Sequence, residues 1–371
     1  MEENFTERLE TPCIVIDRDK AEKNIARMQE AADRAGVALR PHIKTHKMCG
    51  YARMQIRQGA KGITCAKVSE AEVMADGGVD DIFIAYPQVG RFRLERVVKL
   101  ARRCQRLILG IDSLKSARPL SEAFEKAGMR GEVRLEVDTG ARRTGIPYEQ
   151  AVSLAQAVAH MPGLELTGIY TFKGMIFRGN PTQDIEAAAR EEGELMARLA
   201  GELRKSGIAI KDISAGSTPT GTAVAETGFV TEIRPGTYIF NDHMLCREGW
   251  ARPEQIAAHY YVTVVSTPRP EYAVIDGGTK TFPMDVFLDA PPYHYPGYGL
   301  VDGHPDLCLR RMNEEHGILE SPKGNTGLYP GQVLRITPIH ICTAINMQNT
   351  VYEYYEGKLD KRRVDARGMS V

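Results

Sequence analysis

Residues 19–43, DKAEKNIARMQEAADRAGVALRPHI, contain the unit whose repetition decides the fold. In its first part, apolar residues such as Ala21 and Ile25 recur on one helical face, and Gly36 follows where a helix commonly ends. Its second part, residues 37–43, is a short β-rich run. A helix followed by a strand, repeated along a chain, is typical of a parallel sheet covered by helices.

Further β-rich runs alternate with helical patterns as far as about residue 250. With residues 37–43 they give eight strand candidates, which predicts a (β/α)8 barrel, a TIM-type α/β fold, over residues 19–250. The other seven runs are 62–65, 81–85, 107–111, 132–137, 164–170, 210–214 and 232–239.

After about residue 251 the pattern changes to β-branched and aromatic runs separated by Gly and Pro turns. The opening run, residues 11–17, has no helix before it, so we expect it to pair with this later segment. The sequence therefore predicts a second, antiparallel β domain formed by residues 1–18 and 251–371. Its other strand candidates are 259–266, 271–276, 332–338 and 350–356.

Composition limits the class of partner. The chain has 371 residues, with 48 Lys and Arg against 48 Asp and Glu, so it has no overall charge to attract nucleic acid or an anionic membrane. No apolar run approaches the ~18 residues that span a bilayer. Seven cysteines without close pairs, and an acidic start unlike a signal peptide, favour a cytoplasmic protein with a small-molecule substrate.

A dense group of reactive side chains lies at the end of the first predicted barrel strand, in RPHIKTHK (40–47). Barrel enzymes place catalytic groups at this end of their strands. On an extended strand Arg40, His42, Lys44 and His46 share one face. A lysine amine among other cations can act as a nucleophile toward an aldehyde cofactor. The alternative interpretation is a solvated basic strand end.

These residues make the chain recognisable. TPCIVIDRDKAEKNIARMQ (11–29) and LRPHIKTHK (39–47) resemble the D-threonine aldolase and D-serine dehydratase family, which depends on pyridoxal 5'-phosphate (PLP) and has the alanine-racemase-like fold. The resemblance implies that Lys44 binds the cofactor aldehyde and that His42 contacts the cofactor. Further matches, in the same order, are AKVSEAEV (66–73), EVDTGARRTGI (136–146), SAGSTPT (214–220), EIRPGTYIFND (232–242), DGGTK (276–280), GYGLV (297–301), EEHG (314–317), IHIC (339–342) and ARG (366–368).

Two glycine-containing turns are candidates for the cofactor phosphate, because backbone N–H groups and hydroxyls bind phosphate there. They follow the seventh and eighth predicted strands, where barrels most often bind phosphate. Taken alone, either turn is better explained as an ordinary βα connection. The predicted ligands are Ser217, Thr218, Gly236, Thr237 and Tyr238.

Two more residues are assigned to the cofactor by resemblance. Arg143, after the fifth predicted strand, is similar to the arginine that contacts the cofactor ring in relatives, and a cation there moderates the electron sink. Its neighbour Arg142 is the alternative. Tyr170, which ends the sixth predicted strand, resembles a tyrosine beside the cofactor, although a buried tyrosine is common inside barrels.

His340 and Cys342 form a second candidate pair. On a strand, side chains two residues apart point to the same side, so imidazole and thiolate can hold one metal ion. Without context, a buried histidine beside an inert cysteine is the preferred explanation of the pair. The resemblance implies a divalent metal at this position, with cysteine typical of zinc-binding dehydratases; zinc is the first expectation, and manganese or magnesium are alternatives.

One departure from the family concerns the reaction. Relatives carry a histidine just after the sixth predicted strand, whereas this chain has Phe172 and Lys173 in YTFKG (170–174). A base or substrate contact of relatives is therefore missing. Lys173 becomes the candidate for that role, which makes it a second catalytic candidate beside Lys44.

The resemblance implies a PLP- and metal-dependent lyase acting on D-3-hydroxy amino acids. The first expectation is retro-aldol cleavage to glycine and an aldehyde, as in D-threonine aldolase. The alternative is D-serine dehydratase-like loss of ammonia to give a 2-oxo acid, and a third is an amino-acid racemase without a metal. Relatives build their site between two protomers, so the resemblance also implies a homodimer.

Overall fold

The computed structural model describes residues 5–371, which divide into two compact units. The barrel unit contains Ala26–Lys44, Met48–Gly236 and Met369–Val371. The β unit contains the described chain up to Ile25, together with Thr45–Lys47 and Thr237–Gly368. The sequence predicts a barrel over residues 19–250, and these boundaries remain a prediction. The two compact units differ from them because segments distant in sequence lie together in each unit.

The barrel unit contains the predicted eight parallel strands. They pair in the order β2-β12-β11-β8-β6-β5-β4-β3, and backbone hydrogen bonds join the two outer strands, so the sheet closes. The strands are β2 (Ala38–Leu39), β3 (Ile63–Cys65), β4 (Asp81–Pro87), β5 (Arg106–Ile111), β6 (Gly131–Asp138), β8 (Leu164–Tyr170), β11 (Asp212–Ala215) and β12 (Glu232–Ile233).

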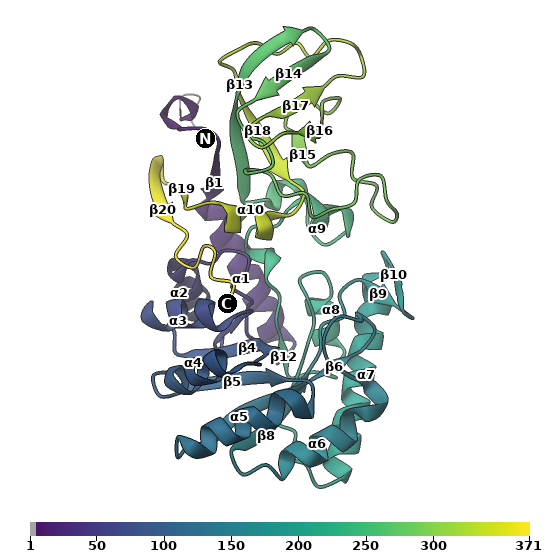
Figure 1. The fold of residues 1–371 in the computed structure, drawn as a ribbon. Helices are drawn as coiled ribbons and strands as arrows, with labels where there is room; N and C mark the ends of the chain where they lie inside the picture. The colour runs from purple at the N-terminus through teal and green to yellow at the C-terminus, as the bar shows by residue number, and fades with distance from the viewer. Residues whose placement is uncertain (1–4) are drawn as a thin grey trace. The chain divides into compact units, whose positions relative to one another are not determined.

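Helices alternate with these strands along the chain (Figure 1). Their buried positions recur every three or four residues, which gives each helix one apolar face for the sheet. The (β/α)8 prediction is confirmed. The helices are α1 (Arg18–Arg34), α2 (Cys49–Gln58), α3 (Val68–Asp76), α4 (Arg91–Ala101), α5 (Leu114–Lys126), α6 (Ala151–Ala159), α7 (Ile185–Lys205) and α8 (Gly221–Glu226); three short strands, β7 (Ile146–Pro147), β9 (Ile176–Phe177) and β10 (Asn180–Pro181), lie between them.

Two predicted strands are shorter than expected. The run 37–43 is a strand only over β2, and the run 232–239 only over β12; residues 237–239 form a 3-10 turn. Pro41 and Pro235 explain the difference, because proline has no N–H to continue a ladder of hydrogen bonds. Pairing past the strand ends continues through single bonds, such as His42 N–H to the Pro235 carbonyl at 2.9 Å.

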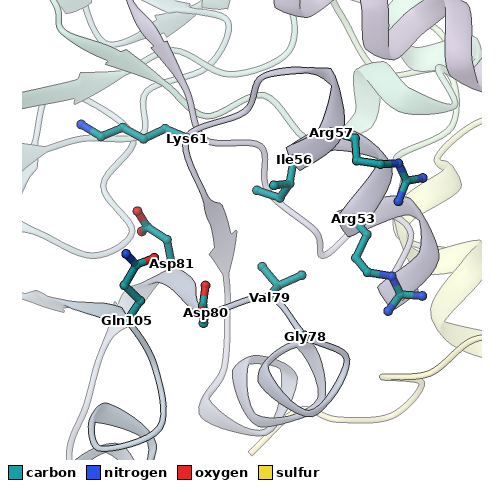
Figure 2. Close-up of a pocket in the computed structure, with 9 residues that line it drawn as sticks. All are labelled: Arg53, Ile56, Arg57, Lys61, Gly78, Val79, Asp80, Asp81 and Gln105. Carbon is teal, nitrogen blue, oxygen red and sulfur yellow. The ribbon is translucent and has the colours of Figure 1, made fainter.

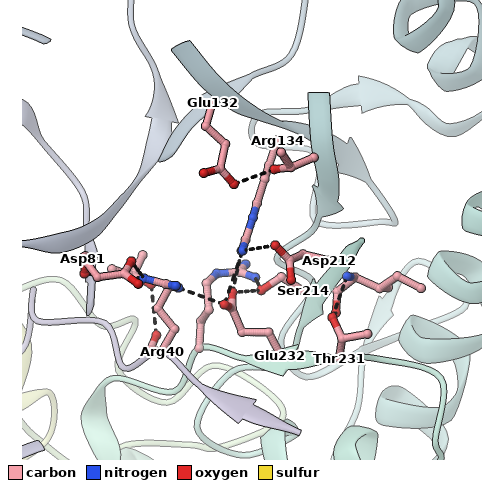
Figure 3. Close-up of polar contacts among 12 residues, drawn as sticks. Arg40, Asp81, Glu132, Arg134, Asp212, Ser214, Thr231 and Glu232 are labelled. Atoms are coloured by element: carbon pink, nitrogen blue, oxygen red, sulfur yellow. Dashed lines mark hydrogen bonds and ion pairs between the residues drawn. The ribbon is translucent and has the colours of Figure 1, made fainter. Parts of the chain in front are cut away.

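The interior of the barrel holds charged side chains. In β6 the residues alternate, and Arg134 lies on the inward face while apolar residues face the helices. The Glu232 carboxylate accepts from Arg40 Nε at 2.8 Å and from Arg134 Nη1 at 2.6 Å, as Figure 3 shows. Arg134 also donates to Asp212 at 2.8 Å, and Arg40 to Asp81 at 2.6 Å. Arg40, Arg134 and Glu232 are fully buried.

The two guanidinium groups keep this carboxylate ionised. Burial alone raises the pKa of Glu232, but the charges of Arg134 and Arg40 hold that pKa well below its ordinary range. Ser214 adds a hydrogen bond to the same carboxylate at 2.6 Å. A buried charge cluster of this kind is stable only while every member keeps its partners.

The β unit is antiparallel, as predicted. Six strands, β13 to β18, close a ring in the order β14-β17-β16-β15-β18-β13, with β13 pairing back to β14. The elements of this unit are β1 (Cys13–Asp17), β13 (Ala258–Arg269), β14 (Tyr272–Ile275), β15 (Gly299–Val301), β16 (Cys308–Met312), β17 (Gly317–Glu320), β18 (Val333–Pro338), β19 (Thr350–Tyr355), β20 (Lys358–Arg363), α9 (His243–Arg247) and α10 (Ile341–Met347).

The opening strand β1 pairs with this unit. It lies antiparallel to β13, with Cys13 opposite Tyr261, and parallel to β19, with Val15 opposite Tyr352. The long strand β13 makes this possible, because its first half pairs with β1 and its second half with β14. The predicted pairing of residues 11–17 is confirmed. Within residues 5–371, no helix is long and apolar enough to cross a membrane.

Replacement of Glu232 by glutamine tests the charge cluster. The change removes the counter-charge that two buried guanidinium groups share and leaves Arg40 only Asp81 and Arg134 only Asp212, so we expect the free energy of unfolding to fall by about 3–5 kcal/mol. Urea unfolding followed by circular dichroism measures it. The control is Glu165→Gln, whose exposed ion pair with Lys211 predicts a loss below about 1 kcal/mol. Equal losses in the two variants would contradict the interpretation.

Candidate active site

Lys44 lies beyond the carboxyl end of β2, in a turn. The bridge of His42 to Thr64 in β3 holds the start of this turn, and the Lys44 N–H donates to His42 Nδ1 at 3.3 Å. The expectation that Arg40, His42, Lys44 and His46 share one face of a strand is wrong, because β2 ends at Leu39. Arg40 instead belongs to the charge cluster inside the barrel. Lys44 itself is partly exposed at the end of the barrel where active sites form.

The other basic residues of this motif have structural contacts in the β unit. His46 is fully buried. Lys47 has a positive φ of 54°, and its ammonium group donates to the Ala366 carbonyl at 3.4 Å. Within the motif, Lys44 is therefore the lysine best placed to meet a ligand.

Arg143 and Lys44 both lie beside the ring of Phe172. The Arg143 guanidinium is 4.4 Å from the ring centroid, and the Lys44 ammonium is 5.8 Å from it. Arg143 is exposed on the loop after β6, where Asp138 accepts hydrogen bonds from the Gly140 and Arg142 N–H groups. Phe172 is 37% exposed, so this face is open to a ligand. Of the two neighbouring arginines, Arg143 is the one in contact with Phe172.

Tyr170 closes the barrel interior at the same end. It is fully buried, its hydroxyl donates to Glu136 at 3.0 Å, and its ring packs edge-on against Phe83 at 4.9 Å. Burial, and then the charge of Glu136, raise the pKa of Tyr170 well above its ordinary value. The hydroxyl therefore remains protonated and serves Glu136; a role beside the cofactor stays a prediction.

The 214–220 segment forms a compact turn between β11 and α8. Gly216 has a φ of +85°, and a Cβ there would lie 2.8 Å from Val224 Cγ1, so only glycine fits without strain. Ser217 N–H donates to Thr220 Oγ1 at 3.1 Å. Thr218 Oγ1 accepts from the Gly236 N–H at 3.2 Å, which links the two predicted phosphate turns. Ser217 and Thr218 are buried hydroxyls just beyond the carboxyl end of β11, the strand that pairs with β12.

The other two predicted phosphate ligands belong to the β unit. Thr237 and Tyr238 follow Gly236 in the 3-10 turn Thr237–Ile239. Tyr238 is fully buried, whereas Thr237 is partly exposed. Thr237 Oγ1 lies 3.4 Å from Cys342 Sγ, so this threonine also contacts the predicted metal pair.

Lys173 is buried against α7. Its ammonium group pairs with Glu191 and donates to the Ala188 carbonyl at 3.3 Å, while its backbone N–H donates to Glu192 at 3.2 Å. These contacts give the side chain a structural role, and a catalytic role for it stays a prediction. Sequence reasoning missed both glutamates, because nothing in the sequence brings residues 18 or 19 positions away to this lysine.

His340 and Cys342 are neighbours, although not on a strand. The strand β18 ends at Pro338, His340 is the N-cap of α10, and Cys342 lies in the first turn of that helix. The expected i, i+2 strand geometry is therefore wrong. The helix start nevertheless allows the imidazole to hydrogen-bond the Cys342 side chain. Thr45 Oγ1 lies 3.1 Å from Cys342 Sγ.

Asp285 orients the imidazole, and sequence reasoning missed it. Its Oδ2 lies 2.7 Å from His340 Nδ1 and also accepts from Thr343 Oγ1 at 3.1 Å. Burial lowers the pKa of His340, yet the charge of Cys342 and the hydrogen bond to Asp285 raise it to about 11. The surroundings thus favour positive charge at this histidine. Across residues 5–371 no group of three or more His, Cys, Asp or Glu side chains is arranged to hold a metal, so the chain offers two ligands and a supporting carboxylate.

Comparison with known proteins decides the family. Residues 16–243 match the family model "Alanine racemase, N-terminal domain", and residues 257–354 match "Putative serine dehydratase domain". The chain is 32% identical to D-threonine aldolase of Arthrobacter sp over 98% of its length and 94% of the relative's. The chain belongs to the D-threonine aldolase and D-serine dehydratase family. It is accordingly a PLP-dependent lyase.

Solved members of this family share the whole fold. The chain is similar to D-threonine aldolase from Filomicrobium marinum, with a TM-score of 0.86 and 29% identity over 99% of this chain and 97% of the other. It is also similar to D-threo-3-hydroxyaspartate dehydratase from Delftia sp. HT23, with a TM-score of 0.88 and 31% identity over 96% and 98% of the two chains. A histidine-to-alanine variant of the latter and a cysteine-to-alanine variant in the metal-free form, changed at positions two residues apart, match equally well.

A cavity of about 320 Å³ lies in the barrel unit, away from these groups. Figure 2 shows basic and acidic side chains around it, and it lies at the amino ends of β3, β4 and β5. Members of barrel families react at the carboxyl ends of their strands, so we do not assign the chemistry here. Its lining residues are Arg53, Ile56, Arg57, Lys61, Gly78, Val79, Asp80, Asp81 and Gln105.

Alanine at Gly216 tests the phosphate turn. An L residue at a φ of +85° costs about 1–2 kcal/mol, and the added Cβ also overlaps Val224, so we expect the free energy of unfolding to fall by at least that amount. The control is Gly201→Ala in the helix α7. No atom lies within 4 Å of a Cβ there, so we expect a gain of about 0.5–1 kcal/mol. Urea unfolding measures both variants, and an unchanged Gly216→Ala protein would contradict the described turn.

Proposed function

We propose that this chain is a metal-assisted PLP lyase of D-3-hydroxy amino acids, with retro-aldol cleavage to glycine and an aldehyde as its reaction. The observation that carries the proposal is that Lys44, Arg143 and the Ser217–Thr218 turn all follow the carboxyl ends of barrel strands, with Lys44 and Arg143 beside the same Phe172 ring. The aldolase and dehydratase relatives named above support the substrate class.

The residues of the barrel unit fit PLP. The 214–220 turn offers the buried hydroxyls of Ser217 and Thr218. They follow Gly216, whose positive φ no other residue adopts without strain, and turns of this kind can bind phosphate. Lys44 offers a partly exposed amine for the aldehyde, and Arg143 offers a cation for the ring. When bound, the cofactor withdraws the electron pair released at the substrate Cα.

The donor atoms of His340 and Cys342 fit one divalent ion, and we propose zinc. Asp285 on Nδ1 leaves Nε2 of the imidazole as the metal-binding nitrogen, the arrangement that usually supports histidine ligands. A solved relative whose cysteine variant is described as metal-free supports the pair. A divalent ion held by these residues would supply Lewis-acid polarisation of a substrate hydroxyl.

The chain's own residues divide the proton transfers. In cleavage, the β-hydroxyl proton leaves as the Cα–Cβ bond breaks, and a proton returns to Cα to give glycine. We propose that Lys44 carries the proton to Cα, because Lys44 is partly exposed whereas Lys173 is buried. The proposed role of Lys173 at the hydroxyl requires it to leave Glu191. Phe172 cannot replace the family histidine as a base, and its ring instead lies beside the Lys44 ammonium group.

Dehydration is the second candidate, and Cys342 favours it, because a cysteine-to-alanine variant of the dehydratase relative is described in a metal-free form. That reaction removes the Cα proton, releases the β-hydroxyl as water, and ends with a 2-oxo acid and ammonia. It needs no base at the hydroxyl. A racemase is the third candidate and needs no metal. We also propose a homodimer, which sedimentation equilibrium measures.

Chemical labelling of Lys44 tests the cofactor assignment. Purified protein should absorb visible light through bound PLP, and borohydride reduction should fix the cofactor on Lys44. Peptide mapping identifies the labelled lysine. A label on Lys47 or Lys173 would refute the assignment.

Metal content tests the proposed metal pair His340 and Cys342. We expect Asp285→Asn to weaken metal binding about 10- to 100-fold, because it removes the carboxylate that orients His340. Cys342→Ala should lower metal content and activity together while leaving PLP absorbance. Atomic absorption measures the metal, and stoichiometric metal in a His340→Ala, Cys342→Ala double variant would disprove the site.

Product analysis separates the reactions. The protein is incubated with D-threonine, D-allo-threonine and D-serine in the presence of zinc, manganese or magnesium. We expect glycine and acetaldehyde from the two threonines; 2-oxobutanoate would establish the dehydratase, and inverted substrate would establish the racemase. Turnover of none of the three would rule out the proposed substrate class for these side chains.

A further inference from the structure

The helix α7 carries one charged residue on its buried face. Its other buried positions, from Ala188 to Leu203, are apolar residues or glycine, whereas Glu192 is a carboxylate with 1% exposure. Burial raises the pKa of Glu192 to about 7, against the opposing effects of the Lys173 and Arg234 charges. A leucine at this position would be sufficient to pack the buried face of the helix. A buried carboxylate is unfavourable unless it is hydrogen-bonded, so its presence indicates a structural role in the loops that it contacts.

Glu192 contacts the phosphate turn at two points. Its carboxylate accepts from the backbone N–H of Gly216 and, at 3.5 Å, from Thr220 Oγ1. The Thr220 oxygen in turn accepts the Ser217 N–H at 3.1 Å and lies 3.0 Å from the Ser217 hydroxyl. A hydroxyl has one proton and two lone pairs, so Thr220 can donate to Glu192 while it accepts from Ser217. The position of the carboxylate therefore determines the position of Ser217 through Thr220.

The same carboxylate also holds the segment that follows β8. Its Oε1 accepts the Lys173 N–H at 3.2 Å, one residue beyond Phe172. One carboxylate, which is the acceptor in each of these contacts, therefore joins the turn that carries Ser217 to the segment that carries the Phe172 ring.

We propose that Glu192 is a positioning residue, which holds the 214–220 turn in the shape that binds the cofactor phosphate. The proposal rests on the proposed function, because it takes Ser217 and Thr218 as phosphate ligands. Glu192 does not touch the cofactor and acts through Gly216 and Thr220.

Comparison of two ligands isolates this role. PLP and pyridoxal differ only in the phosphate, so the ratio of their dissociation constants measures what the phosphate contributes. Apoprotein prepared from the holoenzyme is titrated with each ligand and followed by absorbance. We expect Glu192→Gln to reduce the preference for PLP about tenfold while pyridoxal binding stays near the wild-type value.

Two further variants complete the test. Thr220→Val removes the hydroxyl that links Glu192 to Ser217 and should reduce the preference in the same direction. Glu194→Gln makes the same charge change on the exposed face of α7 and should leave the preference unchanged. The phosphorus NMR shift of bound PLP should change in Glu192→Gln and Thr220→Val and stay unchanged in Glu194→Gln.

The outcomes separate the two proposals. If Glu192→Gln weakens PLP and pyridoxal equally, the residue supports only the fold and the positioning role is wrong. If Glu192→Gln does not fold, an unchanged preference in Thr220→Val overturns the role by itself. A wild-type protein that binds PLP no better than pyridoxal would overturn the proposed function, and the present inference with it.

Discussion

The Glu232 carboxylate, held between Arg40 and Arg134, is the interaction on which the rest of the barrel depends. These side chains come from strands that are not all neighbours: β6 is separated from β12 by two strands in the sheet. The bonds therefore cross the interior, and the fork geometry of each guanidinium fixes the height of one strand relative to another. An apolar interior tolerates small slips, because dispersion has no direction. In this barrel a slip would separate buried charges from their partners. The positions of the strand ends that carry the site are therefore fixed accurately.

A continuous chain of hydrogen bonds leads from that cluster to the carboxyl ends of the strands. Ser214 donates to Glu232 and lies in contact with the buried Arg234, which donates to the Thr171 carbonyl at 2.6 Å. Arg234 also lies over the Tyr170 ring. The segment after β8 and the start of the 214–220 turn thus share supports with the barrel centre. Rigid support of this kind is what a site needs if its groups are to hold fixed positions.

Much of the fold was readable from sequence, and the reasons for the exceptions are local. The helix and strand periods identified all eight barrel units and the opening strand, because buried parallel strands and amphipathic helices leave strong patterns. Proline shortened β2 and β12, which a run of β-formers conceals. Lys44, Arg143 and Phe172 meet as their positions after strands suggest. Asp285, Glu191 and Glu192 were missed, since each acts across a distance in sequence that leaves no pattern.

The placement of β1 has a consequence for synthesis. This strand pairs with β13 and β19, so its partners are made more than two hundred residues later. At ordinary rates of translation that delay is on the order of tens of seconds. All eight barrel strands emerge from the ribosome in the meantime. The earliest strand of the chain is consequently among the last to find its place, and it spends the interval as an unpaired apolar segment that a chaperone or another nascent chain can reach.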